Sequence, residues 1–207
     1  DQLEQYETET WINEGLSMVA EDLVMNWDNS LLDEQRVIPY LENPAADSLC
    51  TWANQLADYA PAYMFMRYFV DRFGTGIIQD LLHSNQFGLA SVVSASGEGS
   101  FIPLFRDWLT AVYVSCQDPA IKNEFQAYNY YQKDLSTLEA SLNVEDFSAE
   151  ISIPDTTGQF IVLDDLGLAK EIRISMEGSS KFKLRVIMFP TAEASFNSCQ
   201  FQLQKVR

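Results

Sequence analysis

Three polar side chains recur along one face of a predicted helix near the start of the chain: Glu14, Ser17 and Glu21. Residues three, four and seven apart in a helix share a face, so these side chains lie close together. The opposite stripe is apolar and is expected to face the core; it consists of Ile12, Leu16, Val19 and Leu23. Taken by itself, a carboxylate on this polar face is a solvated surface group.

The residues around Glu14 resemble a known family. The string Glu9-Thr10-Trp11-Ile12-Asn13-Glu14-Gly15-Leu16-Ser17 resembles the active-site region of gluzincin zinc metallopeptidases. It is most similar to the hyicolysin-like family, in which such a string follows an H-E-x-x-H helix. The resemblance implies that Glu14 is the third protein ligand to zinc. Two neutral His and one carboxylate leave a fourth position for a water molecule that the metal acidifies.

Ser17 and Glu21 are the candidates to hold the Glu14 carboxylate by hydrogen bonds, as the partners of metal ligands commonly do. A solvated helix face is the alternative for both. The family resemblance extends to about Val114, through Tyr59, Tyr63 and the run ending at Gly74, and through the segment from Phe101 to Trp108. It makes Tyr59 or Tyr63 a candidate to stabilise the oxyanion of a tetrahedral intermediate. Core packing is the alternative for both tyrosines.

The chain departs from this family in one decisive respect, because it contains no H-E-x-x-H and its single histidine is His83. His83 has no ligand partner four residues away, which favours a structural role. We therefore expect this polypeptide alone not to hydrolyse peptides. The chain begins at Asp1 rather than Met, and we expect the two His and the general base on an upstream portion of the same protein. The alternative is a lineage that has lost them.

The resemblance predicts the C-terminal part of a secreted or cell-surface zinc metallopeptidase that acts on a peptide or protein substrate. Zinc would be held in the intact protein, and a lipid anchor, if present, would lie on a segment outside this chain. The alternative function is a non-catalytic surface or envelope binding protein with a degenerate metallopeptidase fold. A glycan-binding β module ranks lower, because residues 148–207 contain no Trp or Tyr.

The charge of the chain excludes several partners. The formal net charge is −17 and the sequence pI is about 4.2. Such a chain is repelled by the phosphates of nucleic acids and by anionic lipid surfaces, so we expect no nucleic-acid partner. No apolar run approaches the roughly 18 to 20 residues that span a bilayer, so we expect no transmembrane segment. Ten acidic residues and no basic one precede Arg36, but they lack the spacing of a calcium loop.

Charge and periodicity both change near Phe147. Residues 1–147 hold 23 acidic and 6 basic side chains, whereas residues 148–207 hold 7 of each. Helical spacing of apolar residues precedes this point, and short alternating runs follow it. The sequence therefore predicts an α+β chain in which residues 1–147 form a helical subdomain. Residues 148–207 are predicted to form a small antiparallel, sandwich-like β module.

The periodicity also predicts the individual elements. Helices are expected over residues 11–26, 47–59, 60–73, 75–83 and 100–115, with a short one from Asp118-Pro119. Strands are expected over residues 150–153, 159–163, 171–176, 181–189 and 199–206. The three cysteines, Cys50, Cys116 and Cys199, lack C-x-x-C spacing and are expected to be free and buried, with a disulfide as the alternative.

Overall fold

The computed structural model describes residues 2–25, 32–117, 119–128, 130–132, 134–138, 144–146, 155–162, 171–176 and 200–205. The chain divides into two compact units, Asp1–Ile161 and Val162–Arg207. The predicted boundary near Phe147 falls outside the described residues and stays a prediction. The α-helices are α1 Gln2–Val24, α3 Ile38–Glu42, α4 Tyr59–Phe73, α5 Ile77–Leu82, α6 Leu89–Ser96, α7 Phe101–Ser115 and α8 Pro119–Glu124. None of the helices in these ranges combines the length and apolar content that crossing a bilayer requires.

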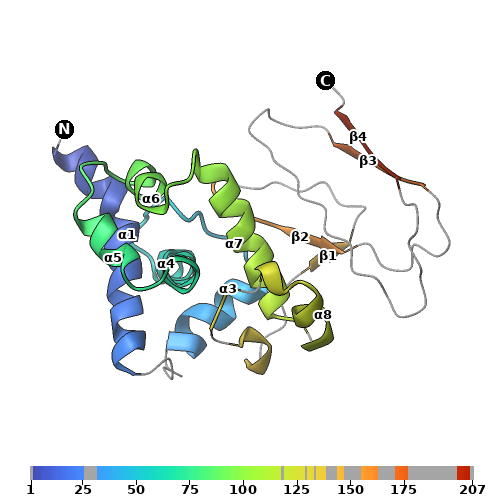
Figure 1. Ribbon diagram of the computed structural model, residues 1–207, viewed down its shortest axis with the longest axis horizontal. Helices are drawn as coiled ribbons and strands as arrows, with labels where there is room; N and C mark the ends of the chain where they lie inside the picture. The colour runs from blue at the N-terminus through green and yellow to red at the C-terminus, as the bar shows by residue number, and fades with distance from the viewer. Residues whose placement is uncertain are drawn as a thin grey trace. The chain divides into compact units, whose positions relative to one another are not determined.

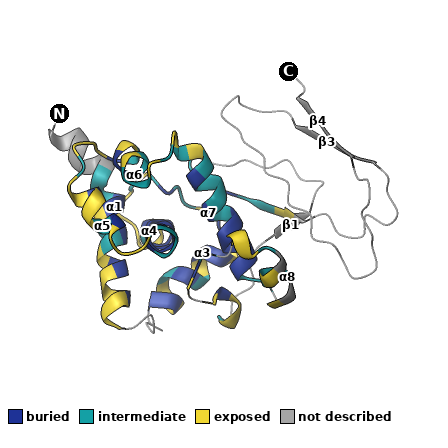
Figure 2. Ribbon diagram, in the orientation of Figure 1, coloured by how far each residue is buried: buried dark blue, intermediate teal, exposed yellow. Residues whose placement is uncertain are grey.

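Helix α4 is the centre of the first unit. Every residue from Ala60 to Val70 is buried, as expected for a helix that is apolar on nearly all sides. Figure 1 shows α4 end-on, with α1 and α5 to one side and α7 to the other, and the ribbon of Figure 2 is coloured as mainly buried along α4. Gly74 ends the helix with φ +84°, a conformation that side chains with a Cβ rarely adopt.

Helix α1 packs across α4 at Gly15. A Cβ at this position would lie 2.6 Å from the Ala62 carbonyl oxygen and 2.7 Å from Met66 Cγ. Glycine is therefore required for this approach between the two backbones. In Figure 1, α1 lies in the plane of the picture, whereas α4 points toward the viewer. The two helices therefore cross at a steep angle.

Helix α7 covers another side of α4. Leu104 and Trp108 are buried in the core, and Phe101, Phe105 and Leu109 pack partly buried against it. Trp108 Nε1 donates to the Tyr131 hydroxyl over 2.8 Å, and that hydroxyl donates to the Met64 carbonyl over 2.8 Å. These bonds connect α7 and the segment after α8 to the central helix.

Residues 155–161 belong to the same unit. Leu49 N donates to the Thr156 carbonyl over 3.0 Å, and the Ser48 and Thr156 hydroxyls lie 2.6 Å apart. A Cβ on Gly158 would lie 2.4 Å from Leu109 Cδ1, so this segment passes close to α7. Phe160 then packs on Tyr113 with ring centroids 5.7 Å apart.

Short elements complete the described chain. One π-helical turn is η1 Asp33–Val37. Short 3₁₀ helices are η2 Leu56–Asp58, η3 Gln126–Tyr128 and η4 Leu135–Thr137. The strands are β1 Val144–Asp146, β2 Phe160–Val162, β3 Glu171–Met176 and β4 Gln200–Lys205, which pair as β1 with β2 and β3 with β4.

The predicted fold class, α+β with an antiparallel β module, is wrong. The described residues are mostly helical, and β3 pairs with β4 in parallel, from Glu171 opposite Gln200 to Met176 opposite Lys205. Alternating apolar residues predict a strand but not the direction of its partner, and a parallel pair needs a connection of a dozen or more residues. Residues 177–199 supply that length. The strands predicted over 150–153 and 181–189 lie outside the described residues.

Several individual elements also differ from prediction. The helix expected over residues 47–59 is a loop that ends in η2, because the Asp58 carboxylate accepts from Ala53 N and Gln55 N and holds the chain in a turn. The helical turns over residues 33–42 and helix α6 were not predicted. Leu23, expected in the apolar stripe of α1, is 39% exposed. The helices predicted over 60–73, 75–83 and 100–115 are confirmed.

Candidate functional site

Glu14 lies half-buried in the middle of α1, between residues that anchor the helix. Trp11 is buried and meets the edge of Phe65 with ring centroids 5.8 Å apart. Gly15 rests on the α4 backbone at Ala62. Among the described residues, no hydrogen bond or ion pair engages the Glu14 carboxylate. The tight packing on either side therefore holds a carboxylate that has no partner within this part of the chain.

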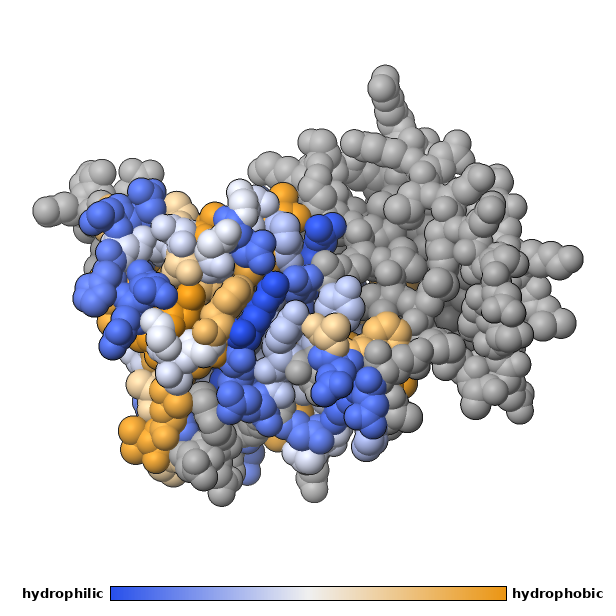
Figure 3. Space-filling view, viewed as in Figure 1, coloured by the Kyte–Doolittle hydropathy of each residue, from blue (hydrophilic) through white to orange (hydrophobic). Residues whose placement is uncertain are grey.

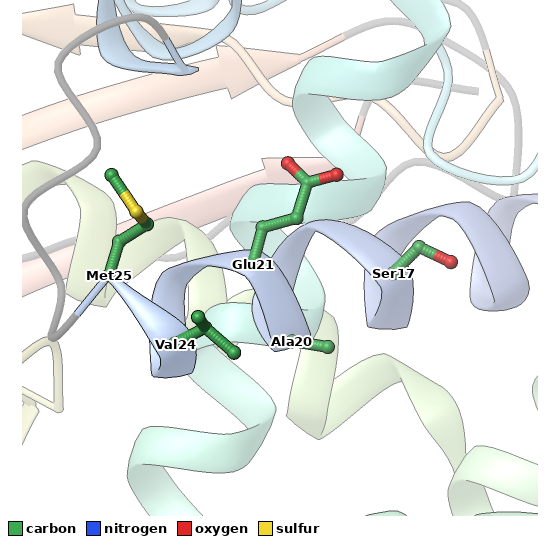
Figure 4. Close-up of a pocket in the computed structure, with 5 residues that line it drawn as sticks. All are labelled: Ser17, Ala20, Glu21, Val24 and Met25. Atoms are coloured by element: carbon green, nitrogen blue, oxygen red, sulfur yellow. The ribbon is translucent and has the colours of Figure 1, made fainter.

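Ser17 and Glu21, predicted to hold Glu14, are both exposed. The Ser17 hydroxyl donates to the Asn13 carbonyl over 2.9 Å, one turn earlier in the helix. Glu21 lines a shallow surface pocket at the C-terminal end of α1, together with Ser17, Ala20, Val24 and Met25 (Figure 4). Within the described residues neither side chain bonds to Glu14, so their predicted role stays a prediction.

The pocket exposes apolar side chains on a surface that is otherwise mostly polar. Val24 is 85% exposed and Met25 is 54% exposed, at the end of α1. On the face drawn in Figure 3, hydrophilic side chains dominate the helical unit and small apolar patches lie between them. Glu21 extends out from the helix in Figure 4. The pocket offers one carboxylate and one hydroxyl for polar contacts.

Tyr63 is buried, and its hydroxyl donates to Asp22 Oδ2. Burial and the neighbouring Asp22 carboxylate raise the pKa of Tyr63 far above its usual value. An oxyanion donor needs its hydroxyl proton directed at the substrate. Here that proton is directed at Asp22, inside the protein.

Tyr59 is half-buried at the start of α4. Its ring meets Trp52 edge-on, with centroids 4.9 Å apart, and the Arg36 guanidinium lies 5.1 Å above its centroid. The structure thus places Tyr59 in a cluster of aromatic and cationic side chains, four residues before Tyr63 in the helix. Its role in oxyanion binding stays a prediction.

A buried ionic cluster that the sequence did not reveal connects α1 to α4. Arg67 Nη1 donates to Asp22 Oδ2 over 2.8 Å, and Arg67 Nε donates to Asp71 Oδ2 over 2.9 Å. The side chain of Arg67 is 1% exposed and those of both aspartates are 0% exposed. Gln132 N also donates to Asp71 Oδ2, over 2.8 Å, which ties the segment after α8 to the same cluster.

One signal in the sequence marks this cluster. Arg67 is the single charged residue in the run from Ala60 to Val70, which is otherwise apolar or aromatic. A charged side chain in a helix that is buried on all sides must be paired with an opposite charge. The sequence does not identify its partner on α1, because Asp22 is one of eight acidic residues in the first 28 positions, and the other seven look alike in sequence.

A second ionic cluster holds α7 to α4. Arg72 Nη1 donates to the Tyr68 hydroxyl over 2.6 Å and to Asp107 Oδ2 over 3.0 Å. Its guanidinium also lies 5.0 Å from the Tyr130 ring centroid. Arg72 is thus occupied by structural contacts.

The described residues do not complete a zinc site. They hold no group of three or more His, Cys, Asp or Glu side chains arranged to bind a metal ion. His83 is exposed at the end of α5, where its backbone N–H caps the helix by donating to the Gln79 carbonyl over 2.9 Å. Glu14 is thus a single possible ligand, and no catalytic step through a metal follows from this chain's residues.

The cysteines provide no nucleophile among the described residues. Cys50 and Cys116 are free, and burial raises the pKa of each thiol to about 12. A thiol with that pKa is protonated at neutral pH and is a poor nucleophile. Cys199 lies outside the described residues.

Comparisons with family models, with curated proteins and with solved structures find no match to this chain.

Proposed function

We propose that this chain is the part of a gluzincin-like zinc metallopeptidase that follows the H-E-x-x-H helix, and that it contributes Glu14 as the third zinc ligand. The observation that carries the proposal is the placement of Glu14. Glu14 is half-buried on α1 and next to the Gly15–Ala62 contact, and its carboxylate has no partner among the described residues. A metal ligand needs this combination of a fixed backbone and a carboxylate not engaged elsewhere.

The protein's own residues have two roles in this proposal. Helix α1 positions the Glu14 carboxylate, and the helical unit supplies one wall of the cleft for a peptide substrate. A zinc ion with two His and one carboxylate ligand lowers the pKa of a bound water to about 7. The two His and the general base would come from an upstream portion of the same protein, and the intact protein would be secreted or displayed at the cell surface.

The test uses the full-length protein rather than these 207 residues. Its coding sequence upstream of Asp1 should contain an H-E-x-x-H motif, and the purified protein should hold one zinc per chain by elemental analysis. Glu14→Gln removes the anionic ligand while it preserves size and helix propensity. We expect this variant to lose stoichiometric zinc and peptidase activity together.

Glu34→Gln is the matched control, because Glu34 is an exposed carboxylate in the π-helical turn outside the Glu14 string. It should retain both zinc and activity. Unchanged zinc content in Glu14→Gln would overturn the assignment of the ligand. A full-length protein without zinc and without an upstream H-E-x-x-H would overturn the whole proposal in favour of a non-catalytic surface or envelope binding protein.

A further inference from the structure

The buried ionic cluster of Asp22, Arg67 and Asp71 has unequal charge. Two carboxylates face one guanidinium, so the cluster carries a net charge of −1 when all three groups are ionised. All three side chains are at most 1% exposed. A net charge inside a protein is strongly disfavoured, and the usual relief is for one group to change its protonation state.

The surroundings of Asp71 add no further positive charge among the described residues. Within the cluster, Arg67 of α4 is bonded to Asp22 of α1. The hydroxyl of Tyr63, also on α4, donates to the same Asp22 carboxylate. From the segment Tyr130–Gln132, the Gln132 amide donates to Asp71 Oδ2 and the buried Tyr131 lies close enough to sense its charge. The buried Asp33 of η1 adds a second negative charge near Tyr63.

We infer that this cluster is a proton-operated latch between α4 and the segment Tyr130–Gln132. With a proton bound at Asp71, the buried cluster is neutral and the Gln132 amide stays bonded to Asp71. When Asp71 releases that proton to solvent, the cluster carries a net negative charge in an apolar interior and the segment loosens. This inference concerns the stability of the fold and is independent of the zinc proposal.

The electrostatics of Asp71 support a segment that is held when this carboxyl is protonated and loosened when it is ionised. Burial raises the pKa of Asp71, and this outweighs the lowering by Arg67 and by the Gln132 N–H. A carboxyl whose pKa is raised on folding stabilises the native state fully below its unfolded pKa of about 3.9. That contribution is lost as pH rises through the higher folded pKa. The latch is therefore closed in acid and loosens toward alkaline pH.

Asp134 offers a control of opposite sign. Burial alone would raise the pKa of this carboxyl, but hydrogen bonds from Lys122 and Ser136 outweigh burial and lower it. Its contribution to stability is present above the unfolded pKa of about 3.9 and is lost as pH falls through the folded pKa. Asp134 lies two residues beyond Gln132, so the same part of the chain carries both directions of pH dependence.

The experiment measures amide hydrogen exchange at Gln132 in the full chain by NMR, as a protection factor corrected for intrinsic exchange. In the wild type, protection should fall by up to about tenfold per pH unit between about pH 3.9 and the folded pKa of Asp71, the slope for release of one proton on opening, and should level off above that pKa. In Asp71→Asn the side chain is neutral at every pH and its oxygen still accepts from Gln132 N. Protection in this variant should then show no fall over that pH range. Asp134→Asn should keep the wild-type dependence.

Two results would overturn the latch. One is a wild-type protection factor that does not change with pH, and the other is loss of Gln132 protection in Asp71→Asn even in acid. If Asp71→Asn fails to fold, the pKa of Asp71 in the wild type decides the question. It is measured by NMR from the chemical shift of the Asp71 carboxyl carbon as a function of pH. A pKa above about 3.9 supports the latch, and a pKa below that value contradicts it.

Discussion

Gly15 of α1 lies directly on the carbonyl of Ala62 in α4, so that a Cβ would come within 2.6 Å of that oxygen. This contact places the Glu14 carboxylate and the buried Asp22 on one rigid helix. Asp22 follows Gly15 by two helical turns and therefore points toward the same helix, where Arg67 receives it. One steric contact and one ionic contact thus fix how α1 sits on α4.

Gly15→Ala tests the steric contact. The added methyl group must displace the α4 backbone or Met66, so we expect a loss of about 1–3 kcal/mol in the free energy of unfolding in urea. Gly76→Ala is the control, because a Cβ at Gly76 meets nothing within 4 Å and this N-cap residue of α5 has φ −59°, which alanine adopts without strain. Equal stability of Gly15→Ala and the wild type would show that the two helices are further apart than described.

Arg67→Met tests the ionic contact. Removal of the guanidinium leaves two buried carboxylates without a counter-charge, and we expect a loss of about 3–5 kcal/mol in the free energy of unfolding. Because the orphaned carboxylates regain neutrality by binding protons, part of this loss should be recovered at acidic pH.

Arg36→Met is the matched control for Arg67→Met. Arg36 is half-buried and lies 5.1 Å above the Tyr59 ring, a contact worth about 0.5–1 kcal/mol at an exposed site. A similar loss from both substitutions would contradict a special role for the buried cluster.

Tyr131→Phe tests the connection between α7 and α4. The Tyr131 hydroxyl accepts from Trp108 Nε1 and donates to the Met64 carbonyl, all within the core. Its removal leaves a buried donor and a buried acceptor without partners, and we expect a loss of about 1–3 kcal/mol in the free energy of unfolding by thermal or urea denaturation. Tyr128→Phe, at a tyrosine that is 38% exposed, should change stability by less than about 0.5 kcal/mol.

The free thiols provide a chemical test of the core. With a pKa of about 12, Cys50 and Cys116 are almost entirely protonated at mildly alkaline pH. In a chain carrying Cys199→Ser, we expect a thiol reagent such as DTNB to react at least about 100-fold more slowly with the native protein than with the unfolded chain, whose thiols have a pKa of about 8.5. Rapid labelling of the native protein would show that these sites are open to solvent.

The sequence by itself determined the elements that depend on local pattern. The long apolar run after Pro61, ended by Gly74, predicts α4, and the spacing of Leu104 and Trp108 predicts α7 and its buried face. Alternation of apolar and polar residues predicts β3. These features are set by neighbours within a few residues, so they are readable from the chain.

The candidate site was predicted in part. The sequence predicts Glu14 as a ligand from its string, which stays a prediction, and the structure places this residue on a helix whose backbone is fixed at Gly15. The contacts of Tyr63 were not predicted, since spacing identifies a helix face but not what packs against it. The sequence predicts a helix over residues 47–59, where the structure has a loop and η2, because the turn made by the Asp58 carboxylate has no periodic signal.

Tertiary structure alone decided which charges are buried and which strands pair. Asp22 resembles its acidic neighbours in sequence, yet it is 0% exposed because Arg67, 45 residues away, comes to lie beside it. The alternation of apolar and polar residues in β3 and β4 is compatible with parallel or antiparallel pairing. The connection between them, residues 177–199, is long enough for the parallel pairing that the structure has. Burial and pairing arise from contacts between residues far apart in the chain, and local pattern carries no record of such contacts.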